Sequence, residues 1–381
     1  MRVLHLIHGE GIYGAELILV YLAREMQRLG HEMIVGSIRD PGTPTTELES
    51  FAENCGLTVL PIRIAPRPTP GVVRSLLRIV RQVRADVVHS HGYKADILLG
   101  LLPRSLRGPM LATAHGWTYP PRFTALWLYQ VLDRLSLRRL DRVVVVAPHM
   151  MSVQAVRNLP AGKTIVICNG IPSLQERLSD QLRRGVQPIP DALRRLMSSR
   201  PTLVAIGRLS LEKGFDVLIE AFAAARRGNE AYQLALIGDG PERAALQAQI
   251  GRLGLDDHVL MPGYVDCADR ILESAKAFVM SSFTEGLPLA LLEAMQWRVP
   301  IVATAVGAIP QLLEGGAGTL VRPRDIASLQ NALRRVMTAN GSLAGEVETA
   351  FGRVNRDYSS ARMCGEYVTL YQQIVESRRR L

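Results

Sequence analysis

Two glutamates, Glu285 and Glu293, lie eight residues apart and are the most specific candidates for chemistry in this sequence. Glu285 precedes Gly286 and Pro288, so we expect it just before a helix, with Glu293 inside that helix. A carboxylate inside an otherwise apolar helix is costly to bury without a partner. The vicinal hydroxyls of a ribose would be such a partner, because one carboxylate can accept hydrogen bonds from both.

Groups that could bind phosphate occur in two places. The free N–H groups at the start of the expected helix, near Leu287 and Leu289, suit a phosphate or a sugar hydroxyl. Arg208 and Lys213 lie in a loop after an apolar run, from which both can reach a diphosphate. A solvated loop with ordinary charges is the alternative. Flanking glycines and the scarcity of lysine, with four in the chain, favour binding.

Glycine-rich turns follow two other apolar runs. Three glycines ending at Gly14 precede a helical stretch and suit close approach of a phosphate or sugar, although a tight turn explains them equally well. The spacing is not G-x-G-x-x-G, which disfavours a nicotinamide dehydrogenase. Gly238 opens a second turn and is a candidate on the ligand side, whereas we expect the neighbouring Asp239 to cap a helix.

Three histidines stand at or beyond the ends of apolar runs. His89 and His91 alternate onto one face and could serve a metal, but no third ligand follows at a suitable spacing. We therefore expect packing or loop-anchoring roles for both and no metal site. His115 comes just past a strand, where a polar group points into a ligand crevice more often than into a core.

The elements that must position these residues are strands too apolar to alternate, joined by helices. This pattern is typical of parallel sheets covered on both faces, in which ligands bind beyond the carboxyl ends of the strands. It weakens across 171–199 and then restarts. We predict an α/β protein with two doubly wound, Rossmann-like domains: 1–170, a linker at 171–199, 200–357, and a C-terminal helix at 358–381 returning toward the first domain.

Composition sets outer limits. The 381 residues are 48% hydrophobic and 21% charged, which excludes a disordered chain, and no apolar run is long enough to span a membrane. Four scattered cysteines fit a reducing, cytoplasmic location (Cys55, Cys168, Cys267 and Cys364). The net charge is +10, and residues 1–170 carry +8 of it, with 20 basic against 12 acidic residues.

Taken together, these segments resemble glycosyltransferase family 4, the retaining nucleotide-sugar enzymes of GT-B architecture, over nearly the whole chain. The resemblance is strongest at 207–214 and 285–295, which match the G-R-x(4)-K-G and E-G-x-P-x(4)-E-A-M strings of that family. Two positions depart from its pattern. Gly307-Ala308 stands where two glycines are common, and Trp297-Arg298 where a small residue and glycine are usual.

The resemblance implies a role for each candidate. Arg208 and Lys213 would grip the donor diphosphate, Glu293 would bind the ribose and Glu285 would lie against the donor sugar. The remaining positions that match the family contact the reacting sugar (His115), the phosphate (Gly14) and the base (Tyr264 and Val265). The resemblance also implies that the sheets of the two domains face each other across a cleft and that the enzyme needs no metal or other cofactor. The donor would be a hexosyl-type sugar linked to UDP or GDP, and the acceptor a saccharide or lipid-linked glycan that attacks from the front face. The implied role is in cell-surface polysaccharide or glycolipid assembly.

Three alternatives remain open. A GT-B epimerase would need acid and base carboxylates near the nucleotide sugar but no acceptor, and a GT-B phosphorylase would need a cofactor-linked lysine, for which Lys276 is poorly placed. A nucleic-acid-binding protein is disfavoured because only 5% of residues are aromatic and no recognition motif appears.

The basic excess has two explanations of equal weight. Arg74, Arg78 and Arg81 share one face of an expected helix, which could rest peripherally on an anionic membrane at the inner face of the plasma membrane. A solvated face in an arginine-rich protein is the other explanation.

Overall fold

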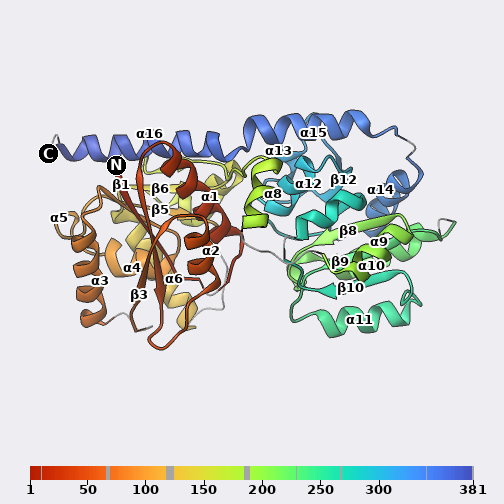
Figure 1. Ribbon diagram of the computed structural model, residues 1–381, viewed down its shortest axis with the longest axis horizontal. Helices are drawn as coiled ribbons and strands as arrows, with labels where there is room; N and C mark the ends of the chain where they lie inside the picture. The colour runs from red at the N-terminus through yellow and green to blue at the C-terminus, as the bar shows by residue number, and fades with distance from the viewer. Residues whose placement is uncertain are drawn as a thin grey trace. The chain divides into compact units, whose positions relative to one another are not determined.

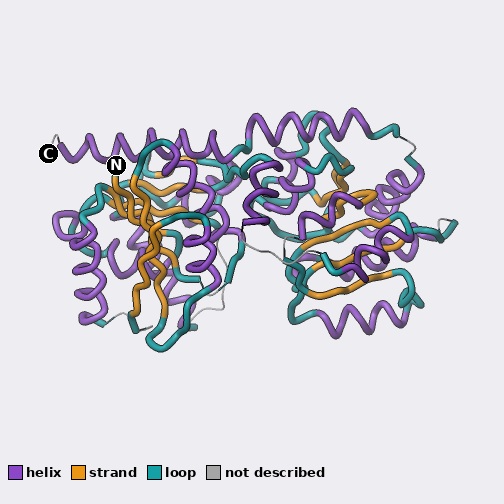
Figure 2. The backbone as a smooth tube through the Cα atoms, in the orientation of Figure 1, coloured by secondary structure: helices purple, strands orange, loops and turns teal. Residues whose placement is uncertain are grey.

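The computed structural model describes residues 1–9, 11–65, 69–116, 124–183, 189–228, 230–266, 268–339 and 341–379, which form two compact units. The first unit is Met1–Pro172 with Ser359–Leu381, and the second is Ser173–Tyr358. Each unit has helices packed around a sheet of its own (Figures 1 and 2). The prediction of two doubly wound α/β domains is confirmed.

The sheet of the first unit has seven parallel strands in the order β3-β2-β1-β4-β5-β6-β7. Its strands are β1 (Arg2–Ile7), β2 (Glu32–Arg39), β3 (Thr58–Arg63), β4 (Val87–Ser90), β5 (Met110–Ala114), β6 (Arg142–Val145) and β7 (Thr164–Val166). The joining helices are α1 (Gly14–Arg28), α2 (Glu47–Asn54), α3 (Pro70–Val83), α4 (Tyr93–Gly100), α5 (Arg104–Arg107), α6 (Ala125–Arg139), the 3-10 turn η1 (Pro148–Ser152) and α7 (Gln154–Arg157).

The two faces of this sheet differ in polarity. Leu4 and Leu6 of β1 face an apolar core shared with α3, α4 and α6. His5 alternates onto the opposite face and pairs in register with His89 of β4, and both are fully buried. One face is therefore a hydrocarbon core, and the other encloses imidazoles.

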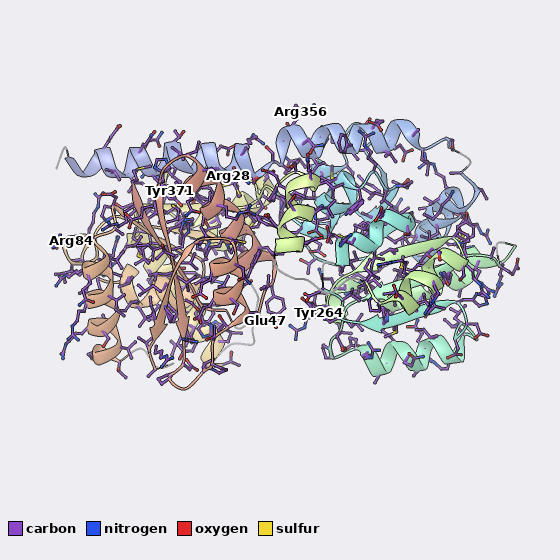
Figure 3. All side chains as sticks on the ribbon, in the orientation of Figure 1. Arg28, Glu47, Arg84, Tyr264, Arg356 and Tyr371 are labelled. Carbon is purple, nitrogen blue, oxygen red and sulfur yellow. The ribbon has the colours of Figure 1, made fainter. Side chains whose placement is uncertain are left out.

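The C-terminal helix α16 (Ser360–Arg379) covers the histidine face. It runs beside α1, and its Tyr371 hydroxyl lies 2.6 Å from His89 Nδ1 (Figures 1 and 3). The Tyr367 hydroxyl lies 2.8 Å from Thr113 Oγ1. A bridge pairs Ile171 with Ser359, so the chain leaves and re-enters the first unit at neighbouring points.

The sheet of the second unit has six parallel strands in the order β10-β9-β8-β11-β12-β13. Its strands are β8 (Thr202–Ile206), β9 (Gln233–Ile237), β10 (Val259–Gly263), β11 (Ala275–Met280), β12 (Ile301–Thr304) and β13 (Thr319–Val321). The helices are α8 (Leu174–Arg183), α9 (Asp191–Ser199), η2 (Leu211–Lys213), α10 (Phe215–Arg226), α11 (Arg243–Arg252), η3 (Ala268–Ser274), α12 (Leu289–Gln296), α13 (Ile309–Leu312), α14 (Ile326–Thr338) and α15 (Ala344–Asp357). An apolar core lies between the strands and α10, α11 and α14.

The expected linker at 171–199 differs from the structure. From Ser173 onward this segment belongs to the second unit and carries α8 and α9. Its mixed charge conceals an amphipathic pattern, since Arg177 is buried in α8 and Leu193 and Met197 are buried in α9. The connection between the units is consequently short.

Two further observations bear on the cellular setting. Among the described residues, Cys55, Cys168 and Cys364 are free thiols, while Cys267 falls outside them. In the same part of the chain, every helix is too short or too polar to cross a bilayer.

Candidate functional site

The loops that follow β8, β9 and β10 interlock through backbone hydrogen bonds at the carboxyl edge of the second sheet. Gly207 N–H donates to Ile237 O at 3.0 Å, and Gly238 N–H donates to Gly263 O at 3.0 Å. Gly238 has a φ of 141°, and a Cβ there would stand 2.0 Å from Gly207 O. Glycine is required at this point because a side chain would separate the two loops.

Lys213 and Glu285 meet at the same edge. Lys213 Nζ donates to Glu285 Oε1 at 2.6 Å, and Ser282 Oγ donates to the same oxygen at 2.6 Å. The lysine and glutamate side chains are 24% and 10% exposed, so both are partly withdrawn from water. Gly214 follows Lys213 at a φ of 61°, and a Cβ there would meet Ser281 O at 2.4 Å. The two loops thus bring a cation and a carboxylate together from 72 residues apart.

Glu293 lies in α12 over a buried ionic cluster. Arg177 Nη1 lies 3.6 Å from Glu293 Oε1 and forms a closer ion pair with Asp269. Arg177 Nε donates to Gln296 Oε1 at 3.1 Å, and Gln181 Nε2 donates to Asp269 Oδ1 at 3.0 Å. α8 thereby fixes α12 and η3 through one guanidinium.

The protonation of Glu293 follows from this setting. Burial, followed by the neighbouring Asp269 carboxylate, raises the pKa of Glu293 to about 8, and Arg177 opposes that rise. The Glu293 side chain remains 16% exposed, so it is not sealed from a ligand. A carboxyl group with this pKa is mostly protonated at pH 7 and must lose its proton before both of its oxygens can accept hydrogen bonds from a ligand.

The start of α12 lies beside the loop that follows β12. Pro288 is the N-cap of α12, so the N–H groups of its first turn, beginning at Leu289, point out of the helix, and Leu287 is buried just before it. Ala308 stands where the family pattern often has a second glycine. Its N–H donates to Gly286 O at 3.0 Å with φ at −82°, which alanine adopts freely. The departure at Ala308 leaves this backbone contact intact.

The other departure, at Trp297-Arg298, changes packing. Arg298 takes a φ of 56°, a conformation that favours glycine. Its guanidinium lies 3.8 Å from the ring centroid of Phe351, a cation–π contact that offsets the backbone cost. Trp297 Nε1 donates to Asp269 Oδ2 at 3.5 Å.

The remaining predicted residues of this unit are placed around the same edge. Arg208 is exposed on the loop that carries Lys213. Tyr264 follows β10 and is 69% exposed (Figure 3), and Val265 beside it is half-buried. An exposed aromatic ring at a strand end is available for stacking on a flat ligand.

In the first unit, β1, β4 and β5 are neighbours, so their carboxyl-end loops gather in the same way. Gly14 is exposed as the first residue of α1. His115 is half-buried after β5, and its Nε2 lies 3.3 Å from His91 Nδ1. Burial lowers the pKa of His115 to about 4, so the ring is neutral at pH 7.

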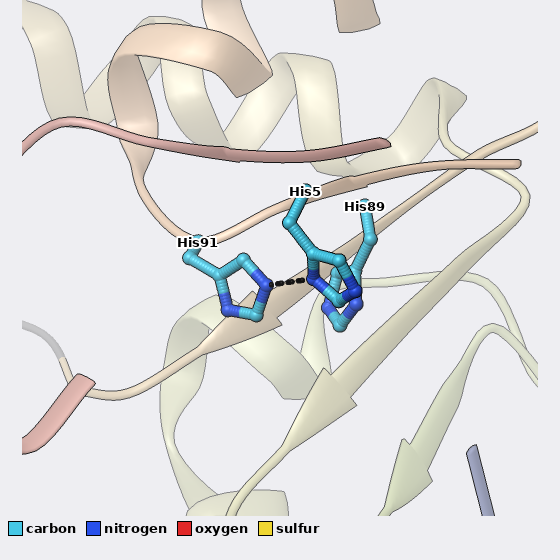
Figure 4. Close-up of side chains that lie close together, drawn as sticks. All are labelled: His5, His89 and His91. Atoms are coloured by element: carbon cyan, nitrogen blue, oxygen red, sulfur yellow. Dashed lines mark hydrogen bonds between the residues drawn. The ribbon is translucent and has the colours of Figure 1, made fainter. Parts of the chain in front are cut away.

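His89 and His91 are both buried, and His5 completes a cluster with them (Figure 4). One ring nitrogen from each lies within 4.8 Å of the others, so the group is a candidate metal site by distance. Both nitrogens of His89, however, contact hydroxyls, Tyr371 at 2.6 Å and Thr113 at 2.7 Å. This anchoring accounts for His89 without a cation.

Sequence reasoning missed three participants. Arg177 lies in the segment that was expected to be a linker. A helical pattern of apolar residues around it could have indicated α8, but two nearby prolines obscured that pattern. Ser282 lies three residues before Glu285, and this spacing could have identified it as a hydrogen-bond donor to the Glu285 carboxylate. His5 alternates with Val3 and Ile7 in β1, and a polar residue inside an apolar strand is the signal that could have identified it.

Comparison with known proteins was made by family and by structure. A family model described as "Glycosyltransferase Family 4" matches residues 12–173, and one described as "Glycosyl transferases group 1" matches residues 200–339. The 2-deoxystreptamine N-acetyl-D-glucosaminyltransferase of Streptomyces fradiae is 26% identical over 91% of this chain and 89% of its own. The alpha-D-kanosaminyltransferase of Streptomyces kanamyceticus is 27% identical over 70% and 71% of the two chains.

Solved structures share the fold. Anabaena HepE, crystallised with UDP-glucose, superposes with a TM-score of 0.77 at 21% identity over 100% of both chains. The sucrose-phosphate synthase of Thermosynechococcus elongatus gives a TM-score of 0.76 at 19% identity over 99% of this chain and 100% of that one. The expected GT-B class of fold is confirmed.

The ionic cluster under Glu293 generates a prediction about stability. We expect Arg177→Met to lower the free energy of unfolding by about 3–5 kcal/mol at pH 7, because the buried Asp269 loses its ion pair and Gln296 loses its hydrogen-bond donor. Urea denaturation measures the change. Arg194→Met is the control, since it removes an exposed pair with Asp191 and should cost less than about 1 kcal/mol. Equal losses in the two variants would contradict the role of Arg177.

Proposed function

Since this chain belongs to glycosyltransferase family 4 and is a glycosyltransferase of the GT-B fold that uses a nucleotide sugar, we propose that it is a metal-independent retaining enzyme that transfers a hexosyl-type sugar from a UDP- or GDP-linked donor. UDP is the first nucleotide to test, because HepE was crystallised with UDP and UDP-glucose. The observation that carries the proposal is the Lys213–Glu285 contact at the edge where Gly207, Gly238 and the start of α12 gather.

In the proposed mechanism, positive groups neutralise the leaving diphosphate. Lys213 Nζ is held at a fixed point by Glu285, and Arg208 extends from the same loop. The acceptor hydroxyl oxygen attacks the anomeric carbon from the side of the leaving group, and the bond from that carbon to the diphosphate oxygen breaks. The acceptor proton passes to the departing phosphate oxygen. Lys213 and the N–H groups at the start of α12 stabilise the charge that develops there.

The remaining assignments are those that the family resemblance implies. Glu293 accepts the ribose hydroxyls, Tyr264 and Val265 cradle the base, and Gly238 allows close approach of the nucleotide. For the first unit, the family resemblance assigns His115 to the reacting sugar and Gly14 to the phosphate. Glu285 contacts the sugar while it holds Lys213.

The acceptor is proposed to be a saccharide or a lipid-linked glycan in cell-surface polysaccharide or glycolipid assembly. A cavity of about 140 Å³ in the first unit, between the start of α4 and α6, supports an acceptor with an apolar part. It is lined by Ile64, Ala65, Tyr93, Lys94, Ile97, Leu98 and Tyr129. The lining is mainly apolar and aromatic, and its one lysine, Lys94, already pairs with Asp40 at 3.5 Å, so the cavity suits the apolar part of an acceptor.

Removing the lysine tests the reaction. We expect Lys213→Ala to lower kcat about a hundredfold or more while the protein stays folded, because one group that stabilises the leaving diphosphate is lost. Lys213→Arg, which keeps the charge, should retain more of the wild-type kcat.

Three further measurements test the rest of the proposal. A thermal-shift screen with UDP, GDP and ADP selects the nucleotide of the donor, NMR of the product reports the anomeric configuration, and an assay with EDTA shows whether turnover needs a metal. Wild-type turnover in Lys213→Ala, or isomerised donor without acceptor, would contradict the proposal.

Nucleotide binding should depend on pH through Glu293. The ribose hydroxyls donate to the carboxylate, whereas the carboxyl group in the free protein has a pKa of about 8 beside Asp269 and Arg177. Affinity should therefore rise with pH, about tenfold per unit below pH 8, and level off above it. Calorimetry in buffers of different ionisation enthalpy should show proton release at pH 7. A pH profile for Glu293→Gln as steep as that of the wild type would disprove this assignment.

We also propose that α3 contacts an anionic membrane at the inner face of the plasma membrane. Arg74, Arg78 and Arg81 are exposed, and Arg84 follows at the end of α3 (Figure 3), while Leu76 and Val80 are buried on the opposite side. Within the described residues, no acidic side chain forms an ion pair with Arg74, Arg78 or Arg81. Their charge is thus available to a lipid headgroup.

Liposome co-sedimentation tests this contact. Replacing Arg74, Arg78 and Arg81 with Gln should weaken binding to anionic vesicles about a hundredfold at low salt, since each basic residue contributes about 1 kcal/mol near the surface. The control removes equal charge from exposed positions of the second unit (Arg194, Arg195 and Arg227). No binding by the wild type at low salt would overturn the membrane proposal.

A further inference from the structure

Three imidazoles in the first unit form a hydrogen-bonded chain that ends at His115. His5 Nδ1 lies 2.9 Å from His91 Nε2, and His91 Nδ1 lies 3.3 Å from His115 Nε2. The chain runs from the fully buried His5 to the half-buried His115 (Figure 4 shows its first link). Because the Nε2 of His115 is hydrogen-bonded to His91, Nδ1 is the ring nitrogen of His115 that can face a ligand.

Each ring in this chain is neutral. Burial lowers the pKa of His5 to about 3 and that of His115 to about 4. Burial and the three neighbouring histidines hold the pKa of His91 well below its usual range. A neutral imidazole has one N–H and one lone pair, so the direction of one hydrogen bond in the chain sets the direction of the next.

The inner end of the chain decides that direction. His5 Nε2 is buried and, among the described residues, has no hydrogen-bond partner. An orphaned N–H in a core is costlier and rarer than an orphaned lone pair. The proton of His5 is therefore on Nδ1 and is donated to His91 Nε2. His91 in turn donates from Nδ1 to His115 Nε2, and the proton of His115 must lie on Nδ1.

We propose that His5 and His91 are positioning residues that hold His115 in the Nδ1–H tautomer, so that His115 donates a hydrogen bond to an oxygen of the donor substrate. The tautomer follows from the hydrogen-bond geometry of these neutral, buried rings, whereas the identity of the acceptor oxygen rests on the proposed function. His115 would then bind a hydroxyl or phosphate oxygen of the nucleotide sugar without carrying a charge of its own.

A metal at His5, His89 and His91 is the rival explanation of the cluster. A cation there would need a lone pair from His89, whose Nδ1 and Nε2 both contact hydroxyls. It would also replace the bond between His5 and His91. Within the described residues, no carboxylate belongs to the group, so the charge of a divalent ion would be buried without an anion.

Nitrogen NMR of histidine-labelled protein tests the tautomer directly, with His115→Gln used to assign the resonances. We expect the His115 proton on Nδ1 in the wild type. His5→Leu and His91→Leu should produce a mixture of tautomers at His115 and lower kcat about tenfold, with the Kd for UDP little changed. His91→Gln can accept from His5 and donate to His115, and it should recover part of the loss.

Tyr371→Phe is the matched control, because it removes one buried hydrogen bond from the same cluster but none from the chain. It should alter neither the His115 tautomer nor kcat. A wild-type proton on Nε2 of His115 would overturn the proposal, as would one equivalent of zinc that co-purifies with the wild type and is lost in His5→Leu. If no nucleotide sugar is turned over but the Nδ1–H tautomer is found, the proposed function fails and the tautomer assignment stands.

Discussion

The second unit depends on one guanidinium that is buried between two acidic side chains. Asp269 and Glu293 come from different elements, and Arg177 lies within ion-pair distance of both. Because Arg177 lies on α8 and also contacts Gln296, the ion pair ties the start of the unit to α12. The position of Glu293, and with it the edge where Lys213 and Glu285 meet, follows from that tie.

The first unit encloses polar groups by a different means. Its histidines are neutral, so their burial requires hydrogen-bond partners but no counter-charge. Tyr371 of α16 and Thr113 of β5 supply hydroxyls to His89, and His5, His91 and His115 form hydrogen bonds with one another. The carboxyl edges of the two sheets are therefore stabilised differently. Ion pairs fix the side chains at the edge of the second sheet, whereas hydrogen bonds between neutral groups fix those at the edge of the first.

Much of this arrangement could be predicted from the sequence, because apolar runs mark parallel strands and the polar residues just past them mark the ligand edge. Lys213 and Glu285 meet at that edge, and Glu293 lies inside the helix that follows, where the sequence predicts it. α8 and α9 could not be found in this way, since two prolines and mixed charge hide an amphipathic pattern. The contact of His89 with Tyr371 spans 282 residues, and no local pattern carries such information.

The entry and exit of the chain at Ile171 and Ser359 have a consequence for biosynthesis. The second unit is continuous in sequence, whereas the first is completed only by α16, which follows the second unit in the chain. A nascent chain can finish the second unit while the first still lacks the cover over its histidines. Until α16 has been synthesised, that face of the sheet lacks its cover. The first unit can therefore complete its histidine face only after the whole second unit has been made.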